Sequence, residues 1–126
     1  IWIIDSGATS HMTHNKEALS NYVGYKSAKE ILVGDGEHID AEGEGWIFLR
    51  AKDQAKVLKK VLFVPRMPVN LFSVKAALEE GFNINFTKKH VEVQHQGEKL
   101  RAFYDGCLFS IKLDILSEQS VGPNEA

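Results

Sequence analysis

The sequence predicts a mostly β domain with one short helix late in the chain, and three observations lead to this prediction. Short apolar runs recur between glycine-containing turns, as they do in successive strands. Residues 82–86 alternate apolar and polar side chains, a pattern typical of a half-exposed strand. Helical spacing of apolar residues occurs in one place, just before Gly81, a residue type that often ends helices. The residues with that spacing are Leu71, Val74, Ala77 and Leu78.

Length and composition indicate one soluble domain. The 126 residues, 44% of them hydrophobic, are enough for one core but too few for two. The 15 basic and 17 acidic residues are spread along the chain, without the basic stripe that direct contact with nucleic acid needs. No apolar run approaches the roughly 20 residues of a membrane span. We therefore expect an intracellular, cytoplasmic protein that binds neither nucleic acid nor membrane. Because the chain starts inside a strand and without methionine, we also expect it to be part of a longer polypeptide.

Cysteine and histidine chemistry is not expected to carry the function. Cys107 is the single cysteine, so the chain can form no internal disulfide and no cysteine-based zinc site. On an apolar strand, we expect it to be a small buried side chain. His11 and His14 lie three residues apart but lack a third ligand nearby, so we interpret both as polar loop residues. We expect no metal and no cofactor.

The first element is a buried strand over residues 1–4 that ends in an acid. Its four apolar residues run into Asp5-Ser6-Gly7-Ala8, where the glycine permits a tight turn. A carboxylate in this position must be hydrogen-bonded, paired or functional, because an unpaired buried charge is costly. Residues 10–25 have no sustained period, so we expect a loop there with at most one helical turn.

Two hairpins are expected next. The first has a mobile, glycine-rich tip at Gly34-Asp35-Gly36-Glu37. Gly43 and Gly45 punctuate the chain before the second hairpin. The strands of the first hairpin cover 30–33 and 38–41, and those of the second cover 46–51 and 57–64.

Further β segments are expected after the helix, and the chain is expected to have three parts. The late strands cover 82–86, 90–94, 99–104 and 107–113. The three parts are a core over 1–86, an additional β segment over 87–116 and a polar tail or linker over 117–126. We expect the tail to be disordered, because its composition cannot bury enough apolar surface.

The ordered set of motifs resembles the retropepsin family of aspartic proteases. The similarity is greatest to the protease region of copia-type (Ty1/copia) LTR retrotransposon Gag-Pol polyproteins. There, as here, an Asp5-Ser6-Gly7-Ala8 turn is followed by His11-Met12-Thr13. The other matching motifs are Val33-Gly34-Asp35-Gly36, Val61-Leu62-Phe63-Val64-Pro65 and Asn70-Leu71-Phe72-Ser73-Val74. The resemblance covers residues 3–86 and implies a closed β-barrel with a flap hairpin and one short late helix, followed by extra C-terminal strands.

The resemblance also implies a role for individual residues. Asp5 would be the catalytic carboxylate, and the supports of its turn would be Ser6, Gly7 and Ala8. The flap that closes over the substrate would comprise Val33, Gly34, Asp35, Gly36 and Ile39. The apolar walls of the substrate pocket would be Ala8, Val33, Ile39, Val69 and Leu71.

Peptide hydrolysis by this design needs two carboxylates that share one proton. One takes a proton from the attacking water while the other polarises the carbonyl oxygen. The chain carries a single Asp-Ser-Gly motif, because Asp35-Gly36 and Asp105-Gly106 lack the intervening hydroxyl. We therefore expect a homodimer that brings two copies of Asp5 together. The resemblance implies an aspartic endopeptidase that cleaves extended segments of its own polyprotein.

Two alternatives remain open. Ser73-Val74 occupies the place of a glycine–arginine pair whose arginine, in retroviral proteases, supports the active-site turn and the dimer. The chain could therefore be a catalytically silent, domesticated domain kept for dimerisation or peptide binding. It could also be monomeric and inactive alone, with dimers forming inside capsid-like particles, where its local concentration is high.

Overall fold

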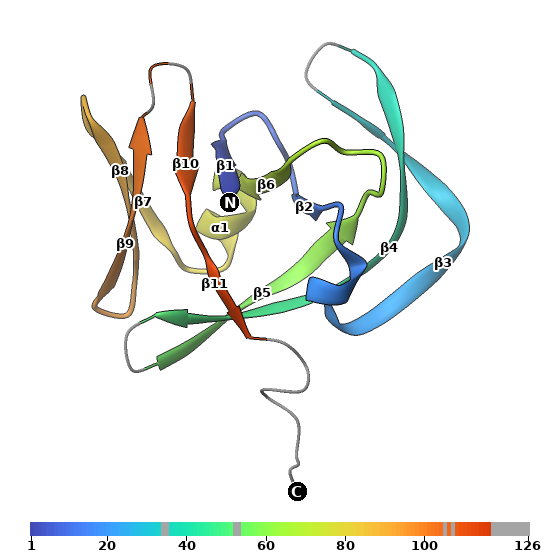
Figure 1. Cartoon of the computed structure of the whole chain (residues 1–126), viewed down its shortest axis with the longest axis horizontal. Helices are drawn as coiled ribbons and strands as arrows, with labels where there is room; N and C mark the ends of the chain where they lie inside the picture. Colours follow the sequence, from blue (N-terminus) through green and yellow to red (C-terminus); the bar gives the residue numbers. More distant parts are fainter. Residues whose placement is uncertain (34–35, 52–53, 105, 107, 117–126) are drawn as a thin grey trace, which may run out of the picture.

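The computed structural model describes residues 1–33, 36–51, 54–104, 106 and 108–116. Within these residues the chain is mostly β with one short α-helix, as predicted (Figure 1). The elements are β1 (Trp2–Asp5), β2 (His11–Thr13), the 3-10 turn η1 (Lys16–Ala18), β3 (Ser20–Leu32), β4 (His38–Ala51), β5 (Gln54–Phe63), β6 (Asn70–Ser73), α1 (Val74–Glu79), β7 (Asn83–Phe86), β8 (His90–His95), β9 (Glu98–Tyr104), β10 (Phe109–Ile111) and β11 (Asp114–Leu116).

Strand β6 lies at the centre of the sheet, between β1 and β2. It runs parallel to β1 and antiparallel to β2. The hydrogen-bonded order is β11-β4-β5-β2-β6-β1-β10-β9-β8-β7, with β3 paired to β4. Ser73, at the end of β6, therefore lies beside Asp5, where the first turn of the chain begins.

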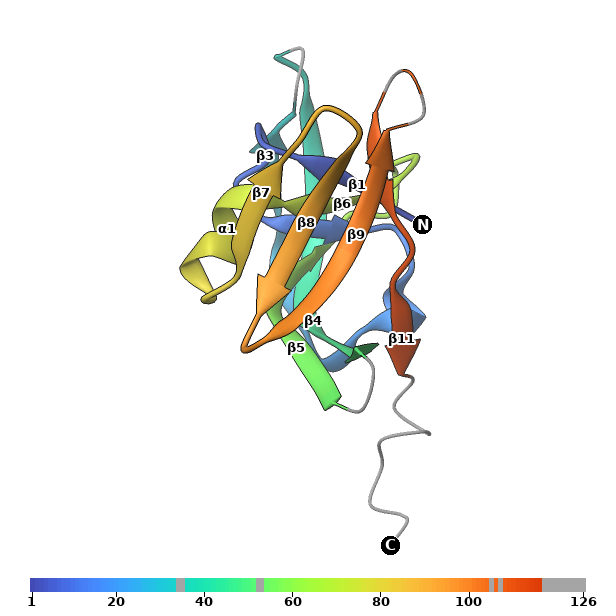
Figure 2. The same cartoon turned by 90° about the vertical axis from the view of Figure 1, so that its left-hand side faces the viewer.

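The described strands form an open sheet, which differs from the closed barrel that the resemblance implied. β10 pairs with the edge of β1 that β6 leaves free, and the sheet continues outward through β9, β8 and β7. Among the described residues, no pairing joins β7 to β11 or β3 at the other end. The sheet curls around its core without closing (Figure 1, Figure 2).

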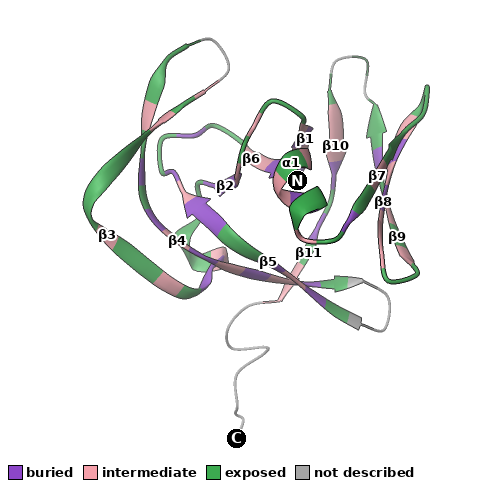
Figure 3. Ribbon diagram, turned by 180° about the vertical axis from the view of Figure 1, so that it is seen from behind, coloured by how far each residue is buried: buried purple, intermediate pink, exposed green. Residues whose placement is uncertain are grey.

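Strand β3 is much longer than expected, and the predicted loop over 10–25 is wrong. β2, η1 and the first half of β3 occupy that segment, and η1 is its one helical turn. Most residues of β3 are exposed (Figure 3), so its sequence lacks the alternation that identifies a half-buried strand. The first predicted hairpin is confirmed, because Glu30 pairs with Asp40 and Leu32 with His38.

Gly43 and Gly45 do not interrupt β4, which runs through both of them. A Cβ on Gly43 would lie 2.6 Å from the carbonyl oxygen of Val23, and one on Gly45 would lie 2.8 Å from that of Ser20. These glycines are therefore required by the close approach of β3 to β4, and they do not mark a turn.

The apolar spacing near residue 71 spans two elements. Leu71 belongs to strand β6, and α1 starts only at Val74. Ser73 is the N-cap, since its Oγ accepts a hydrogen bond from the Ala76 N–H at 3.0 Å. Gly81 ends the helical region as predicted, with a φ of +94° that other residues rarely adopt.

The C-terminal segment adds antiparallel strands, as expected. Gln96 and Gly97 form the tight turn between β8 and β9, with φ angles of 51° and 85°. The strand expected over 107–113 is shorter, since β10 covers Phe109–Ile111, and a further strand that was not expected, β11, follows it and pairs with β4. The expectations for Gly34, Asp35, Cys107 and the tail over 117–126 lie outside the described residues.

Two apolar clusters form the interior. The larger one joins β1, β4, β5, β6, α1 and the C-terminal strands, and it includes the completely or almost completely buried Trp2, Ile47 and Phe72. The smaller cluster consists of Met12, Ala41, Leu62, Val64 and Met67. Partly buried side chains of the β3–β4 hairpin and of β6 pack against the smaller cluster, which therefore anchors the hairpin beside the Asp5 turn. In the described part of the chain, no helix is long and apolar enough to cross a membrane.

Candidate active site at the end of strand β1

Asp5 is the last residue of β1 and starts the turn that leads to β2. Trp2 and Ile4 point into the larger cluster, so Asp5 projects from the opposite face of the strand and is half-buried. Its Oδ1 accepts a hydrogen bond from the Gly7 N–H at 2.7 Å. A Cβ on Gly7 would lie only 3.3 Å from the same oxygen, so glycine suits this close turn.

A cavity of about 260 Å³ opens at Asp5. Its other lining residues are Gly7, Ala8, Met12, Leu32, Val33 and Leu71. Four predicted site residues therefore join Asp5 there: Gly7, Ala8, Val33 and Leu71. Sequence reasoning missed Met12 and Leu32 as lining residues. Met12 could have been found only from the strand register, which places it opposite Leu71.

A second, larger hollow of about 530 Å³ lies beneath the β3–β4 hairpin. Val33 lines both hollows, and Ile39 lines the second one. The remaining lining residues of the second hollow are Glu37, His38, Arg66, Met67 and Pro68. Open space therefore extends on both sides of Val33, from the Asp5 turn towards the turn before β6.

The other predicted site residues that the structure describes, Ser6, Gly36 and Val69, lie outside these two linings. Val69 is exposed and lines neither hollow. Ser6 is exposed on the Asp5 turn, and Gly36 is exposed with a φ of +89° at the described end of the hairpin tip. The structure therefore brings together Asp5, its turn, the hairpin residues Leu32 and Val33, and Leu71 of β6, but not Val69.

Ser73 connects the Asp5 turn to α1. It is the register partner of Asp5 across the β1–β6 pair and is completely buried. Its hydroxyl donates to the Ala8 carbonyl at 2.7 Å while it accepts from Ala76, so one side chain holds both the turn and the helix start. Ser73 thus supports the Asp5 turn from the place that the glycine–arginine pair occupies in retroviral proteases. A serine just before a helix is an N-cap signal that could have revealed half of this role.

His11 lies in β2 and is completely buried, so its interpretation as a loop residue is wrong. Its Nδ1 accepts the Ser73 N–H at 3.0 Å, and its Nε2 lies 3.2 Å from Glu80 Oε1. Because Nδ1 is an acceptor, the hydrogen of the neutral ring is on Nε2 and is donated to Glu80. The partner lies 69 positions away in the sequence, so no local pattern predicts the contact.

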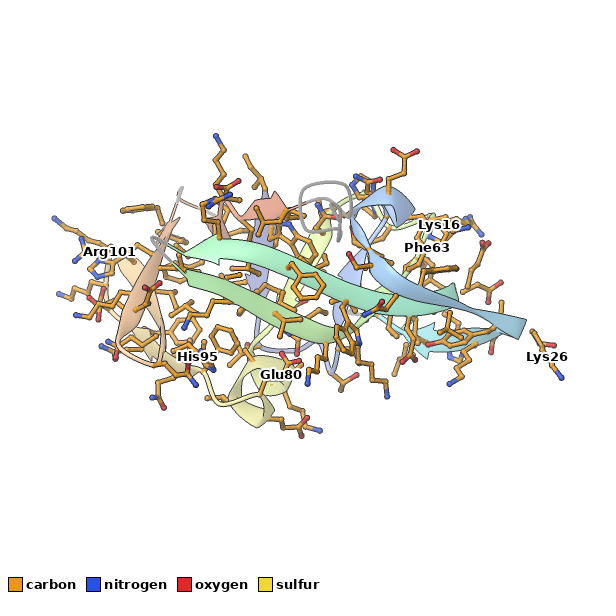
Figure 4. The ribbon with its side chains drawn as sticks, turned by 90° about the horizontal axis from the view of Figure 1, so that it is seen from below. Lys16, Lys26, Phe63, Glu80, His95 and Arg101 are labelled. Carbon is orange, nitrogen blue, oxygen red and sulfur yellow. The ribbon has the colours of Figure 1, made fainter. Side chains whose placement is uncertain are left out.

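Glu80 joins this network to a bulge in β5. Gly45 pairs with Val61 and Ile47 with Leu58, so Lys59 and Lys60 together face one residue of β4. Lys60 adopts a φ of +57° there. The Lys59 N–H donates to Glu80 Oε2 at 2.7 Å. Figure 4 shows Glu80 at the end of α1, next to β5.

Tyr25 holds the base of the β3–β4 hairpin. Its ring packs against the smaller cluster, and its hydroxyl donates to Glu44 Oε1 at 2.7 Å. Burial, followed by the hydrogen bond to Glu44 and the charge of that carboxylate, raises the pKa of the Tyr25 phenol well above its usual range. The phenol therefore remains a neutral donor at ordinary pH.

Comparison with known proteins identifies a family and several relatives of this chain. Residues 2–82 match the family described as "Pol polyprotein, beta-barrel domain". The chain is 36% identical over 73 residues to the "Retrovirus-related Pol polyprotein from transposon RE2" of Arabidopsis thaliana. The aligned residues make up 58% of the chain and 5% of that protein. The chain is also 31% identical over 94 residues to the corresponding RE1 polyprotein of the same plant. That alignment includes 74% of the chain and 6% of the RE1 polyprotein.

A protein assigned to transposon Ty5-1 of Saccharomyces cerevisiae is 37% identical over 73 residues, which cover 58% of the chain and 47% of that protein. The chain thus spans a small part of the two plant polyproteins and about half of the yeast protein. No solved structure matches it. The family match covers both the Asp5 turn and the network that supports it. The chain belongs to the family of Pol polyprotein β-barrel domains.

Proposed function

We propose that this domain is an aspartic endopeptidase that works as a homodimer and processes a retrotransposon Gag-Pol polyprotein. One observation carries the proposal: Asp5 stands at the end of a buried strand, on the wall of a largely apolar cavity, with one carboxylate oxygen held by the Gly7 N–H. Membership in a Pol polyprotein family supplies the setting, since such chains contain the segments that would be cleaved.

The chemistry requires a second copy of the chain. Asp5 is the one carboxylate among the described residues that line its cavity. Water attack on a peptide carbonyl needs an ionised carboxylate to accept a proton and a protonated one to polarise the carbonyl oxygen. A two-fold dimer would bring Asp5 and its symmetry mate together. The Gly7 hydrogen bond engages Oδ1, which leaves the other oxygen for the water.

The substrate would be an extended peptide between the Asp5 turn and the β3–β4 hairpin. The apolar walls formed by Ala8, Val33 and Leu71 suit an apolar side chain next to the bond that is cleaved. The hairpin would supply strand-like backbone contacts and cover the site. In this arrangement, Leu32 and Val33 would contact the substrate from the flap.

The test is cleavage of a polypeptide that includes the natural sequences flanking this domain. Wild-type protein should yield site-specific fragments, and pepstatin should inhibit their formation. Asp5→Asn should abolish cleavage while circular dichroism remains unchanged. The matched control is Asp114→Asn, which changes an exposed aspartate on the distant strand β11 and should leave cleavage intact.

Two outcomes would contradict the proposal. Full activity in Asp5→Asn would exclude Asp5 as the catalytic acid. Folded wild-type protein that yields no fragments, even when sedimentation shows it to be dimeric, would favour the catalytically silent domain.

A further inference from the structure

We propose that His11 and Glu80 are positioning residues for the catalytic loop. Neither lines the cavity at Asp5, yet both belong to a chain of hydrogen bonds that ends on the carbonyl of Ala8, a lining residue. The inference rests on the proposed function, in which Asp5 is catalytic. It adds that the position of Asp5 depends on a buried imidazole and a carboxylate from a distant part of the chain.

His11 fixes the backbone of β6 next to Asp5. The Ser73 N–H donates to His11 Nδ1 at 3.0 Å, and the Ser73 hydroxyl holds Ala8 at 2.7 Å. A displacement of Ser73 is therefore passed in one step to the loop that carries the acid. Misplacing a reacting group by about 1 Å can slow an enzyme about 100-fold.

Glu80 in turn fixes His11. The completely buried ring has a polar partner on each nitrogen, and Glu80 Oε1 is the partner of Nε2. Glu80 Oε2 accepts the Lys59 N–H, which the bulge in β5 directs towards it. The carboxylate is thus held by the backbone of the sheet, and both of its oxygens are used as acceptors.

This arrangement predicts that conservative replacements will fail in specific ways. Glu80→Gln keeps the size of the side chain but offers one acceptor oxygen to two N–H donors. In His11→Gln the amide can still donate to Glu80, but the acceptor for the Ser73 N–H is lost. In His11→Asn the amide oxygen can replace Nδ1, so this variant should restore part of the activity.

A matched control is available in the C-terminal sheet. His90 of β8 also pairs with a carboxylate, Glu92, at 3.4 Å, and both side chains are partly buried. His90→Gln removes a histidine–glutamate contact of the same kind, in a strand that contributes no residue to the cavity at Asp5.

The experiment combines steady-state cleavage with hydrogen exchange of the Ser73 amide. We expect His11→Gln and Glu80→Gln to lower kcat about tenfold with KM within about twofold, since a positioning defect acts on the chemical step. Ser73 exchange should accelerate in both, and His11→Asn should have a kcat between those of His11→Gln and wild type. His90→Gln should keep the wild-type kcat and Ser73 exchange rate.

The outcomes separate this inference from the proposed function. If wild-type cleavage depends on Asp5 but His11→Gln and Glu80→Gln keep the wild-type kcat, the positioning role is wrong. Equal losses of kcat in these variants and in His90→Gln would also overturn it, because only general stability would then be involved. If wild-type protein cleaves nothing, the proposed function fails. Independently of cleavage, unchanged exchange of the Ser73 amide in His11→Gln would overturn the hydrogen-bond network itself.

Discussion

Replacing Ser73 with alanine removes the hydroxyl that joins the Asp5 turn to α1. That hydroxyl donates to the Ala8 carbonyl at 2.7 Å and accepts from the Ala76 N–H at 3.0 Å. Loss of an N-cap costs about 1 kcal/mol, and loss of a buried hydrogen bond costs about 1 kcal/mol more. We therefore expect Ser73→Ala to lower the free energy of unfolding by about 2 kcal/mol.

Urea denaturation followed by tryptophan fluorescence measures this loss, because Trp2 is buried in the larger cluster. The matched control is Ser110→Ala in β10, where the hydroxyl makes no hydrogen bond within the described residues. We expect the control to change the free energy of unfolding by less than about 0.5 kcal/mol. A loss in Ser73→Ala no larger than in the control would refute both the capping and the tethering roles of Ser73.

Three further predictions concern the hairpin and the C-terminal sheet. Gly43→Ala should destabilise the fold by about 1–3 kcal/mol, because its methyl group would lie 2.6 Å from the Val23 carbonyl oxygen; an unchanged urea midpoint would argue against this packing. The pKa of Tyr25 is raised above the reference value of 10.0, so its contribution to stability is complete below pH 10 and is lost as the pH rises towards the folded-state pKa. Tyr25→Phe should reduce this alkaline loss in denaturation measured across pH, and an identical pH profile would contradict the assignment. The hydrogen bond from His90 lowers the pKa of Glu92 below the reference value of 4.5. The stability that ionised Glu92 contributes is therefore present above pH 4.5 and is lost as the pH falls through the folded-state pKa. Glu92→Gln should reduce this loss of stability at acid pH. An unchanged acid profile would mean that other carboxylates cause the loss.

The parts of the fold that could be predicted from sequence are those with local signals. β1 is followed by a turn that contains Gly7, α1 is followed by Gly81, and β8 and β9 are joined by Gln96-Gly97. In contrast, β3 has exposed residues on both faces, so burial imposes no alternation on it. The glycines of β4 were interpreted wrongly because glycine is used both in turns and where two strands approach closely. The sequence alone does not distinguish these two uses.

The candidate site was predictable in its acid and its turn but not in its support. The Asp5 motif is contiguous, whereas the support depends on which strands become neighbours. β6 lies between β1 and β2, and that order alone brings Ser73 beside Asp5 and Leu71 beside Met12. The buried His11 contacts Glu80, which lies 69 positions away in the sequence at the end of α1. A residue-by-residue interpretation therefore finds the candidate acid but not the groups that hold its turn.

In the proposed enzyme, the cavity at Asp5 would be an incomplete site in a single copy of the chain. Leu32 lines it but is 66% exposed, next to a half-buried acid. Burying a leucine side chain contributes about 1.5–3 kcal/mol, so this wall favours any partner that covers it. In the proposed enzyme, the substrate peptide and the second copy provide that cover, and the second carboxylate arrives with the second copy. Because the substrate would contact both copies of the proposed dimer, substrate binding and dimerisation should strengthen each other by the same factor in each direction.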